Sequence, residues 1–502
     1  MFTRRLFLQA AGALAACSAF PRFTSDPFKL GVASGYPTAG SVVIWTRLMG
    51  ELEPSPIPVR WALAADEAMR NIVATGQTAA EPAWAHSARV EVAGLRPDRW
   101  YWYRFTAGDA QSPIGRTRTA PAAGAALERL RFAFASCQQY EQGYYTAYKH
   151  AVADDPDLMV FLGDYIYESS WGKDPVRKHN APEPYMLDEY RARYALYKSD
   201  ADLQAAHAAM PWICTWDDHE VDNDYADDRP EDGMERDQFL ERRAAAYQAY
   251  YEHMPLPPRM QPQGPRMRIY THLDWGGLAR FYLLDTRQYR SWQACPRKGR
   301  RGGSNTIDVE QCPRLASPGR TMLGRAQERW LDHALADSRA PWNVIAQTTT
   351  MAQFDQKPGP GRAAWTDGWD GYPAARERLL NAIVERKARN AVVIGGDVHS
   401  FNVSPLKLDF DDPASPAVAA EFVGTSITSQ AWPPERLDQY RPDNPHFLLM
   451  DGRYRGYTRV EVTPGLLKAD LRAMESVQTR DAACGTLASF VVEDGRPGPL
   501  RA

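Results

Sequence analysis

Four apolar segments of the sequence end in side chains that are common metal ligands. The segments are "RLRFAFASC", "LMVFLGD", "PWICTWDDHE" and "NAVVIGGDVHSF". In order, they deliver Cys137, Asp164, the run Asp217 to Glu220, and the pair Asp397 and His399. Carboxylates that gather in one place repel one another unless a cation compensates them. Thiolate and imidazole groups beside them favour a transition metal.

Each of these segment ends has a simpler explanation when it is taken alone. An Asp after two glycines suits a turn, and a Cys after an apolar strand is commonly a small buried hydrophobe. These explanations would have to apply four times, so the combination favours a metal site. In "GDYIYE", Gly163 permits a tight turn before Asp164. Tyr167 then adds a phenol to the set, whereas we expect Tyr165 to pack in the core.

An α/β arrangement would bring the four segment ends together. Further strands are expected in "LARFYLLDTRQYR" and "PWNVIAQTT", and helices in "GYYTAYKHAVADDPD", "DQFLERRAAAYQAYYEHM" and "GRAQERWLDHALADS". Helices between short apolar strands indicate a layered α/β sheet, and open α/β sheets bind ligands beyond the carboxyl ends of their strands. We expect this domain to span residues 130–480, with a strand-like tail at its end.

A separate β domain is expected before it, over residues 28–120. The runs "SVVIWTRL", "IPVRWALA", "SARVEVAGL" and "RWYWYRFTAG" are rich in β-branched and aromatic residues and are separated by turn residues. Their spacing suggests a β-sandwich of the fibronectin or immunoglobulin type. A stretch rich in Pro, Ala and Gly near residues 119–129 would link the two domains. A length of 502 residues also fits two domains better than one.

Residues 1–27 have the layout of an export signal. Arg4 and Arg5, followed by Phe7 and Leu8, precede an Ala/Leu-rich stretch that falls short of the ~20 apolar residues of a membrane span. This layout resembles a twin-arginine signal, which the twin-arginine machinery uses to export folded proteins. "LAAC" also matches a lipoprotein cleavage box, which would make Cys17 a lipid anchor; a chance cysteine is the alternative. We expect a periplasmic, secreted or membrane-anchored protein.

The cysteines after Cys17 also fit an exported chain, in which disulfides can form. Cys295 and Cys312 flank a stretch rich in Gly, Arg and Ser and are expected to pair. Cys214 lies inside an apolar strand and is expected to be buried and inert. Five cysteines follow Cys17, an odd number, so at least one is unpaired. Cys484 has no assigned partner.

Several motifs together resemble a known enzyme family. "SCQ", "GDYIYE", "WDDHEVDND" and "GGDVHSF" look like the PhoD family of alkaline phosphatases and phosphodiesterases, a branch of the calcineurin-like metallophosphoesterases. "GVASGYPTAGSVVIWTRL", "LLDTRQYR", "MLGRAQERWL", "TDGWDGYP" and "EFVGTSITS" extend the resemblance to about residues 28–475. The resemblance implies a layered metallophosphoesterase domain after an N-terminal β-sandwich. It also implies metal-dependent hydrolysis of phosphate monoesters, diesters or both outside the cytoplasm, for phosphate scavenging.

The family resemblance further implies ferric iron and calcium as metals. Asp164 would bridge metals, while Cys137 as a thiolate and Tyr167 as a phenolate would bind iron. Calcium prefers oxygen ligands. The candidates for it are Asp217, Glu220, Asn223 and Asp224, and Asn223 is our choice among them. The remaining metal ligands implied by the resemblance are Asp218, Asp397 and His399.

Two further residues receive roles outside the metal ligands. His219 matches the family's catalytic histidine, which contacts the substrate or the leaving group. Arg287 could bind phosphate through its planar guanidinium, and a structural salt bridge is the alternative for it.

The remaining alternatives concern the substrate and the activity. A net charge of −3 gives no support to specific nucleic-acid binding, so a small phosphoester is the expected partner. A phospholipase D-like phosphodiesterase acting on lipids or wall polymers would use the same site. A non-catalytic exported binding module would use the β-sandwich instead, and the complete set of strand-end residues argues against it.

Overall fold

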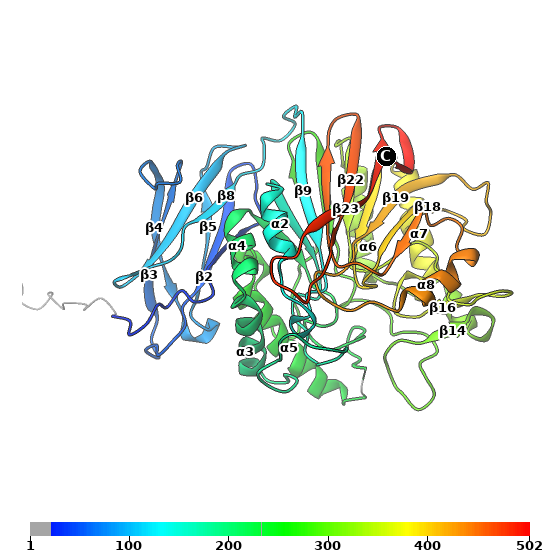
Figure 1. The fold of residues 1–502 in the computed structure, drawn as a ribbon, viewed down its shortest axis with the longest axis horizontal. Coiled ribbons are helices and arrows are strands. Elements are labelled where there is room, and N and C mark those ends of the chain that lie inside the picture. The colour runs from blue at the N-terminus through cyan, green and yellow to red at the C-terminus, as the bar shows by residue number, and fades with distance from the viewer. Residues whose placement is uncertain (1–21, 232) are drawn as a thin grey trace, which may run out of the picture.

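Two large sheets pack against each other in the main part of the molecule (Figure 1). The computed structural model describes residues 22–231 and 233–502. Side chains from both sheets meet in one hydrophobic core, where the rings of Phe132 and Phe281 lie 5.1 Å apart, edge to face. Because each sheet buries one face in this core, its other face is available to helices.

The first sheet has ten strands in the order β24-β23-β22-β21-β9-β10-β11-β1-β2-β5. Its strands are β1 (Val32–Gly35), β2 (Ser41–Arg47), β5 (Ser87–Ala93), β9 (Leu130–Ala135), β10 (Leu158–Leu162), β11 (Trp212–Thr215), β21 (Gly456–Val462), β22 (Leu466–Met474), β23 (Cys484–Glu493) and β24 (Arg496–Arg501). Strands β9, β10 and β11 are parallel neighbours. Their carboxyl ends therefore meet at one edge, as the sequence predicts for three of the four ligand-bearing segments.

The second sheet has seven strands in the order β12-β13-β15-β17-β19-β18-β20. They are β12 (Thr271–Trp275), β13 (Ala279–Leu283), β15 (Trp342–Ala346), β17 (Ala391–Gly395), β18 (Phe401–Lys407), β19 (Ala417–Val423) and β20 (Leu449–Asp451). Strands β13, β15, β17 and β19 run parallel. Strand β17 carries the fourth ligand-bearing end. The predicted strands at β13, β15 and β17 are thus confirmed. A small ladder, β14 (Thr306–Asp308) with β16 (Ala363–Trp365), lies outside both sheets.

Helices cover both sheets. They are α2 (Ala147–Ala153), α3 (Leu187–Lys198), α4 (Ala201–Ala209), α5 (Arg236–His253), α6 (Gly324–Ala336), α7 (Pro373–Glu385) and α8 (Pro434–Tyr440). Helices α2 to α5 join the core of the first sheet, for example through Tyr148 against Trp212. Helices α6 and α7 form a second core with the other sheet, around Leu331 and Leu379. The predicted helices at α2, α5 and α6 are confirmed, as is the layered α/β class.

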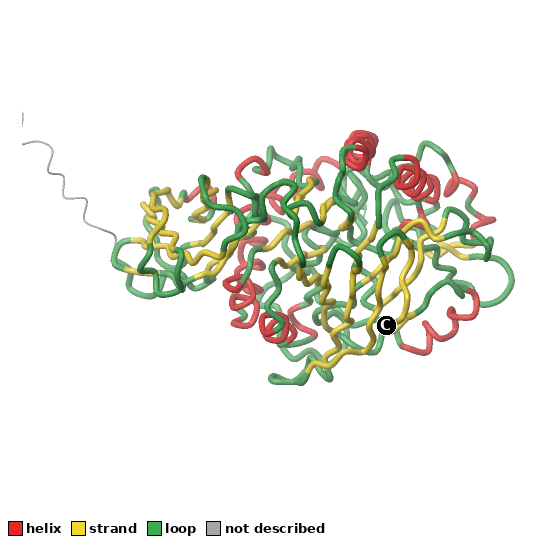
Figure 2. Tube along the Cα trace, turned by 90° about the horizontal axis from the view of Figure 1, so that it is seen from above, coloured by secondary structure: helices red, strands yellow, loops and turns green. Residues whose placement is uncertain are grey.

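The N-terminal strands form a β-sandwich, which stands at one end of the molecule in Figure 2. One layer is the β1-β2-β5 part of the first sheet. The other contains β3 (Ile57–Ala64), β4 (Ile72–Ala80), β6 (Trp100–Ala107), β7 (Ala110–Gln111) and β8 (Gly115–Arg118). Ile44, Val59 and Tyr103 lie in the core between the layers. The predicted strands at β2, β3, β5 and β6 are confirmed.

The sandwich is continuous with the β21-β9-β10-β11 part of the first sheet. Strand β1 pairs with β11 through Gly35 and Trp212. A side chain at Gly35 would place its Cβ 2.5 Å from the carbonyl oxygen of Trp212, so only glycine fits this junction. At the other end, the strand-like tail is β23 and β24, which reach Arg501, past residue 480. The domain boundaries themselves stay predictions.

Arg4, Arg5 and Cys17 of the predicted export signal lie in residues 1–21, outside the described residues. Within the described part, no helix has the length and hydropathy needed to cross a membrane.

Candidate metal centre

A cavity of about 680 Å³ lies where the parallel strands end. Cys137, Asp164, Asp217 and Asp397 each follow the last residue of a strand, β9, β10, β11 or β17, at the same interval. Six of the predicted site residues line the cavity, namely Asp164, Asp218, His219, Asn223, Asp397 and His399. The constant interval explains how four chain segments deliver polar side chains to one place.

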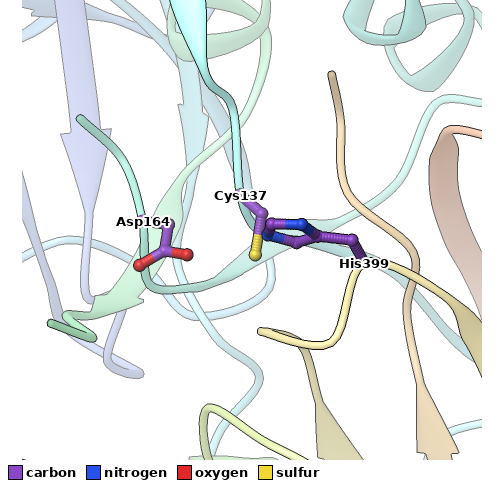
Figure 3. Close-up of side chains that lie close together, drawn as sticks. All are labelled: Cys137, Asp164 and His399. Carbon is purple, nitrogen blue, oxygen red and sulfur yellow. The ribbon is translucent and has the colours of Figure 1, made fainter. Parts of the chain in front are cut away.

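Cys137, Asp164 and His399 form the first group that could hold a metal ion. Their ligand atoms all lie within 4.8 Å of one another, and Figure 3 shows the carboxylate, the sulfur and the imidazole gathered together. The Tyr167 hydroxyl joins them, since it donates to Asp164 Oδ2 at 2.9 Å and lies 3.2 Å from His399 Nε2. The four side chains supply sulfur, nitrogen, carboxylate and phenol oxygen, the mixture that suits a transition metal.

Two more groups adjoin the first. Asp164, Asp218 and His219 form one, and Asp218, Asp224 and Asp367 form the other. Asp164 belongs to the first two groups and Asp218 to the last two, so the three groups make one connected cluster. The third group offers only carboxylate oxygen, which suits a hard cation such as calcium.

Asn223 also lines the cavity. Its side-chain nitrogen donates to Glu231 Oε2 at 2.7 Å. The side-chain oxygen of Asn223 is therefore the atom that could bind a cation.

Several buried carboxylate oxygens lack a hydrogen-bond donor within the described residues. They are Asp164 Oδ1, Asp217 Oδ2, Asp218 Oδ1 and Asp397 Oδ2. Burial raises the pKa of Asp164 well above its usual value, and the charge of Asp218 adds to the effect. Burial raises the pKa of the Cys137 thiol too, and Asp164 raises it further. Buried oxygens without partners are costly, and bound cations would both satisfy them and favour the ionised ligands.

Five candidate ligands adopt a left-handed backbone conformation. They are Cys137 (φ 59°), Asp164 (φ 57°), Asp224 (φ 53°), Asp397 (φ 65°) and His399 (φ 52°). Residues other than glycine rarely adopt this conformation, which costs on the order of 1 kcal/mol or more for each. Such strain is common at functional sites, where the surrounding structure holds the backbone in place.

Gly163 explains how Asp164 reaches the cluster. Its φ of 94° is left-handed, and an added Cβ would lie 2.6 Å from the backbone nitrogen of Asp217. Any side chain there would push the loops after β10 and β11 apart. The glycine therefore permits both the turn and the close approach of the two carboxylate-bearing loops.

His219 is held by a carboxylate that the sequence did not single out. Glu168 Oε2 lies 2.7 Å from His219 Nδ1, and both side chains are buried. Burial acts to lower the pKa of His219, but the charges of Glu168, Asp218 and Asp164 outweigh it and raise the pKa well above its usual value. Because Nδ1 contacts Glu168, Nε2 is the nitrogen that is left to contact a ligand in the cavity. Glu168 is the last residue of the motif "GDYIYE", and its place there was the feature of the sequence that could have identified it.

Comparison with known proteins agrees with this geometry. Residues 132–471 match the family described as PhoD-like phosphatase, and residues 13–121 match the PhoD-like phosphatase N-terminal domain. The chain belongs to the PhoD-like phosphatase family. It is 46% identical to alkaline phosphatase D of Bacillus subtilis (strain 168), over 99% of this chain and 88% of that protein. The solved structure of PhoD superposes with a TM-score of 0.91 and 47% identity, over 96% of this chain and 93% of that one. This PhoD-like phosphatase is therefore an enzyme that hydrolyses phosphoesters.

Arg287 lies behind the candidate site and does not line the cavity. Its side chain is fully buried, with Nε 2.5 Å from Asp217 Oδ1 and Nη1 2.7 Å from Asp367 Oδ2. These contacts match the salt-bridge alternative. Sequence reasoning gave no role to Asp367, which lies in the motif "TDGWDGYP".

The cysteines of the PhoD-like chain follow the sequence expectations where the structure describes them. Cys295 and Cys312 form a disulfide. Cys214 is a buried free thiol, and Cys484 is a half-buried one. The disulfide closes the loop that contains Arg297, a residue of the cavity lining.

Proposed function

We propose that this chain uses a mixed-metal cluster to hydrolyse phosphate monoesters, diesters or both outside the cytoplasm. One observation carries the proposal: three connected groups of metal-binding side chains open onto a cavity, and their buried carboxylate oxygens lack donors among the described residues. A cation at each group is the simplest compensation for that charge.

Ferric iron is proposed for the group that contains sulfur, with Cys137, Asp164, Tyr167 and His399 as ligands. Thiolate, phenolate and imidazole are ligands that favour a transition metal. The other groups are dominated by oxygen and suit calcium. Their proposed ligands are Asp164, Asp218, Asn223 and Asp397, joined by Asp224 and Asp367.

Bound metal ions would supply charge for the phosphate oxygens and a water of lowered pKa. His219 acts as the proton donor from Nε2 to the leaving oxygen. Glu168 fixes the orientation of the imidazole and favours its charged form. The ring of Tyr167 packs against the imidazole of His219, with the two ring centroids 4.0 Å apart.

Loss of a proposed metal ligand tests the proposal. Asp164→Asn and Cys137→Ala are expected to nearly abolish hydrolysis of p-nitrophenyl phosphate and bis-p-nitrophenyl phosphate and to reduce metal content. Cys214→Ala is the matched control, because Cys214 is a buried thiol outside the cluster. Full activity with normal metal content in either ligand variant would contradict the assignment. Rates on monoesters, diesters and phospholipids from the same preparations would define the substrate class.

Export is proposed on the N-terminal sequence. Arg4 and Arg5 would direct the folded enzyme to the twin-arginine machinery, and Cys17 would carry a lipid anchor. Replacing both arginines with lysine should leave active precursor in the cytoplasm; normal export of that variant would refute the route. Mass spectrometry of the exported protein would show whether Cys17 is acylated.

A further inference from the structure

Aromatic side chains surround the mouth of the metal-binding cavity. Trp171, Tyr185, Trp365 and Trp432 line it together with the candidate ligands. Among the described residues, three aromatic side chains are exposed: Trp171 (37%), Tyr185 (39%) and Trp292. Two of the three therefore open onto this one cavity. Large apolar groups at a pocket commonly contact a ligand.

Three of these rings are supported on one face by another side chain. Trp171 stacks on the imidazole of His399, with the ring centroids 5.7 Å apart and the planes 8° from parallel. The guanidinium of Arg242 lies 4.2 Å from the centre of the Tyr185 ring. That of Arg436 lies 4.1 Å from the Trp432 ring.

Cation–π and stacking contacts of this kind fix the orientation of a ring. A ring that is already oriented loses little freedom when a ligand binds to it.

The supporting residues are themselves anchored. Arg242 is buried and pairs with Asp222 Oδ1 at 3.0 Å and with Glu183 Oε1 at 2.7 Å. Arg436 donates from Nε to the hydroxyl of Tyr440 at 3.0 Å. The backbone of Trp171 is also held, since its carbonyl accepts a hydrogen bond from Gln142 Nε2 at 2.6 Å. The rings are thus parts of a fixed frame around the acidic floor.

We propose that Trp171, Tyr185 and Trp432 form an aromatic subsite that stacks on the organic group of the phosphoester. The subsite makes the enzyme prefer esters whose organic group is a planar ring, such as a nucleobase-bearing nucleoside, over esters of short acyclic alcohols. Metal ions bound at the acidic floor would attract the phosphate by charge, whereas the aromatic rings recognise the other half of the substrate by its flat surface. This inference rests on the proposed function, because it assigns the substrate class of the same site.

Stacking of a base on an aromatic side chain corresponds to roughly 5- to 150-fold in affinity for each ring. Loss of one ring should therefore lower kcat/KM for a nucleoside 5′-phosphate about tenfold relative to glycerol phosphate. Most of the change should be in KM, because stacking binds the substrate and the transition state alike.

The test compares Tyr185→Ala and Trp432→Ala with the wild-type enzyme on uridine 5′-phosphate, glucose 6-phosphate and glycerol phosphate. Trp171 is left intact because it packs on His399. Trp292→Ala is the control, because Trp292 is exposed but does not line the cavity. The nucleotide-to-glycerol ratio of kcat/KM should fall in both alanine variants and recover in Tyr185→Phe and Trp432→Phe. It should not change in Trp292→Ala.

Three results would overturn the inference. They are a wild-type enzyme without preference for the nucleotide, an equal loss on all three esters, and a loss on glucose 6-phosphate as large as that on the nucleotide. Failure of the proposed function would look different, because the wild-type enzyme would then hydrolyse none of the esters in a metal-dependent way.

Discussion

The contact between Glu168 and His219 gives a direct test of the proposed proton donor. In Glu168→Gln, the side-chain oxygen can still accept from the backbone N–H of Asn223, which Glu168 Oε1 does at 3.2 Å. The amide nitrogen of the new glutamine would then face His219 Nδ1. The imidazole would have to accept a hydrogen bond there, which favours its neutral form with the proton on Nε2 and lowers the pKa of His219. A neutral imidazole is a much weaker acid than an imidazolium.

The size of the effect follows from the contact that is lost. A hydrogen bond to a charged group contributes about 1.5–3 kcal/mol, which corresponds to about 10- to 150-fold in rate if it acts in the transition state. The decrease in kcat should be largest for esters with a poor leaving group, such as methyl phosphate, because their leaving oxygen needs the proton. p-Nitrophenyl phosphate needs it less. Glu168 is also one of the charges that raise the pKa of His219, so the alkaline limb of the activity profile should move to lower pH.

The assay measures kcat for both esters against pH, with metal content determined on the same samples. Glu328→Gln is the control, because Glu328 is a carboxylate outside the cavity that pairs with Arg378 at 2.7 Å. The control should keep the wild-type ratio between the two esters. An equal loss on both esters in Glu168→Gln, at normal metal content, would refute the role of His219 as a proton donor.

Two other residues offer independent tests. Tyr167→Phe should remove a visible charge-transfer absorption while iron is retained; a colourless wild-type enzyme with full ferric iron would count against a phenolate ligand. Burial lowers the pKa of Lys198 from 10.5 to about 7. The unfolded chain thus binds more protons above pH 7, and wild-type stability should rise between pH 7 and about 10.5 by about 4 kcal/mol relative to Lys198→Met. Denaturation midpoints of both proteins across this range measure the difference, and parallel pH curves would contradict it.

The sequence predicts the strand-borne part of the site well, for a physical reason. A buried parallel strand is an apolar run, and the polar residue that follows it must lie at the sheet edge. Cys137, Asp164, Asp218 and Asp397 could therefore be placed by reading where apolar runs stop. The same logic identified the strands that carry them.

The loop-borne part could not be placed in that way. Asp367 reaches the cluster from a loop between β16 and α7, and nothing local to that loop predicts its distance from Asp218 and Asp224. The sequence left two roles open for Arg287, a phosphate ligand and a structural salt bridge, because its burial among three carboxylates depends on the tertiary fold. Strand β4 was not predicted because most of its side chains are small or polar, and only Ala80 at its end is buried.

The five candidate ligands with a left-handed backbone conformation serve metal binding at a cost to the stability of the fold. Glycine or asparagine would relieve the backbone at those positions, and neither would replace the metal-binding atom in full. Directed evolution that selects only for heat resistance of the metal-free protein would therefore favour inactive variants, in which these five residues are replaced. Libraries built on this protein should keep the five residues constant and seek added stability in the sandwich or in the helices.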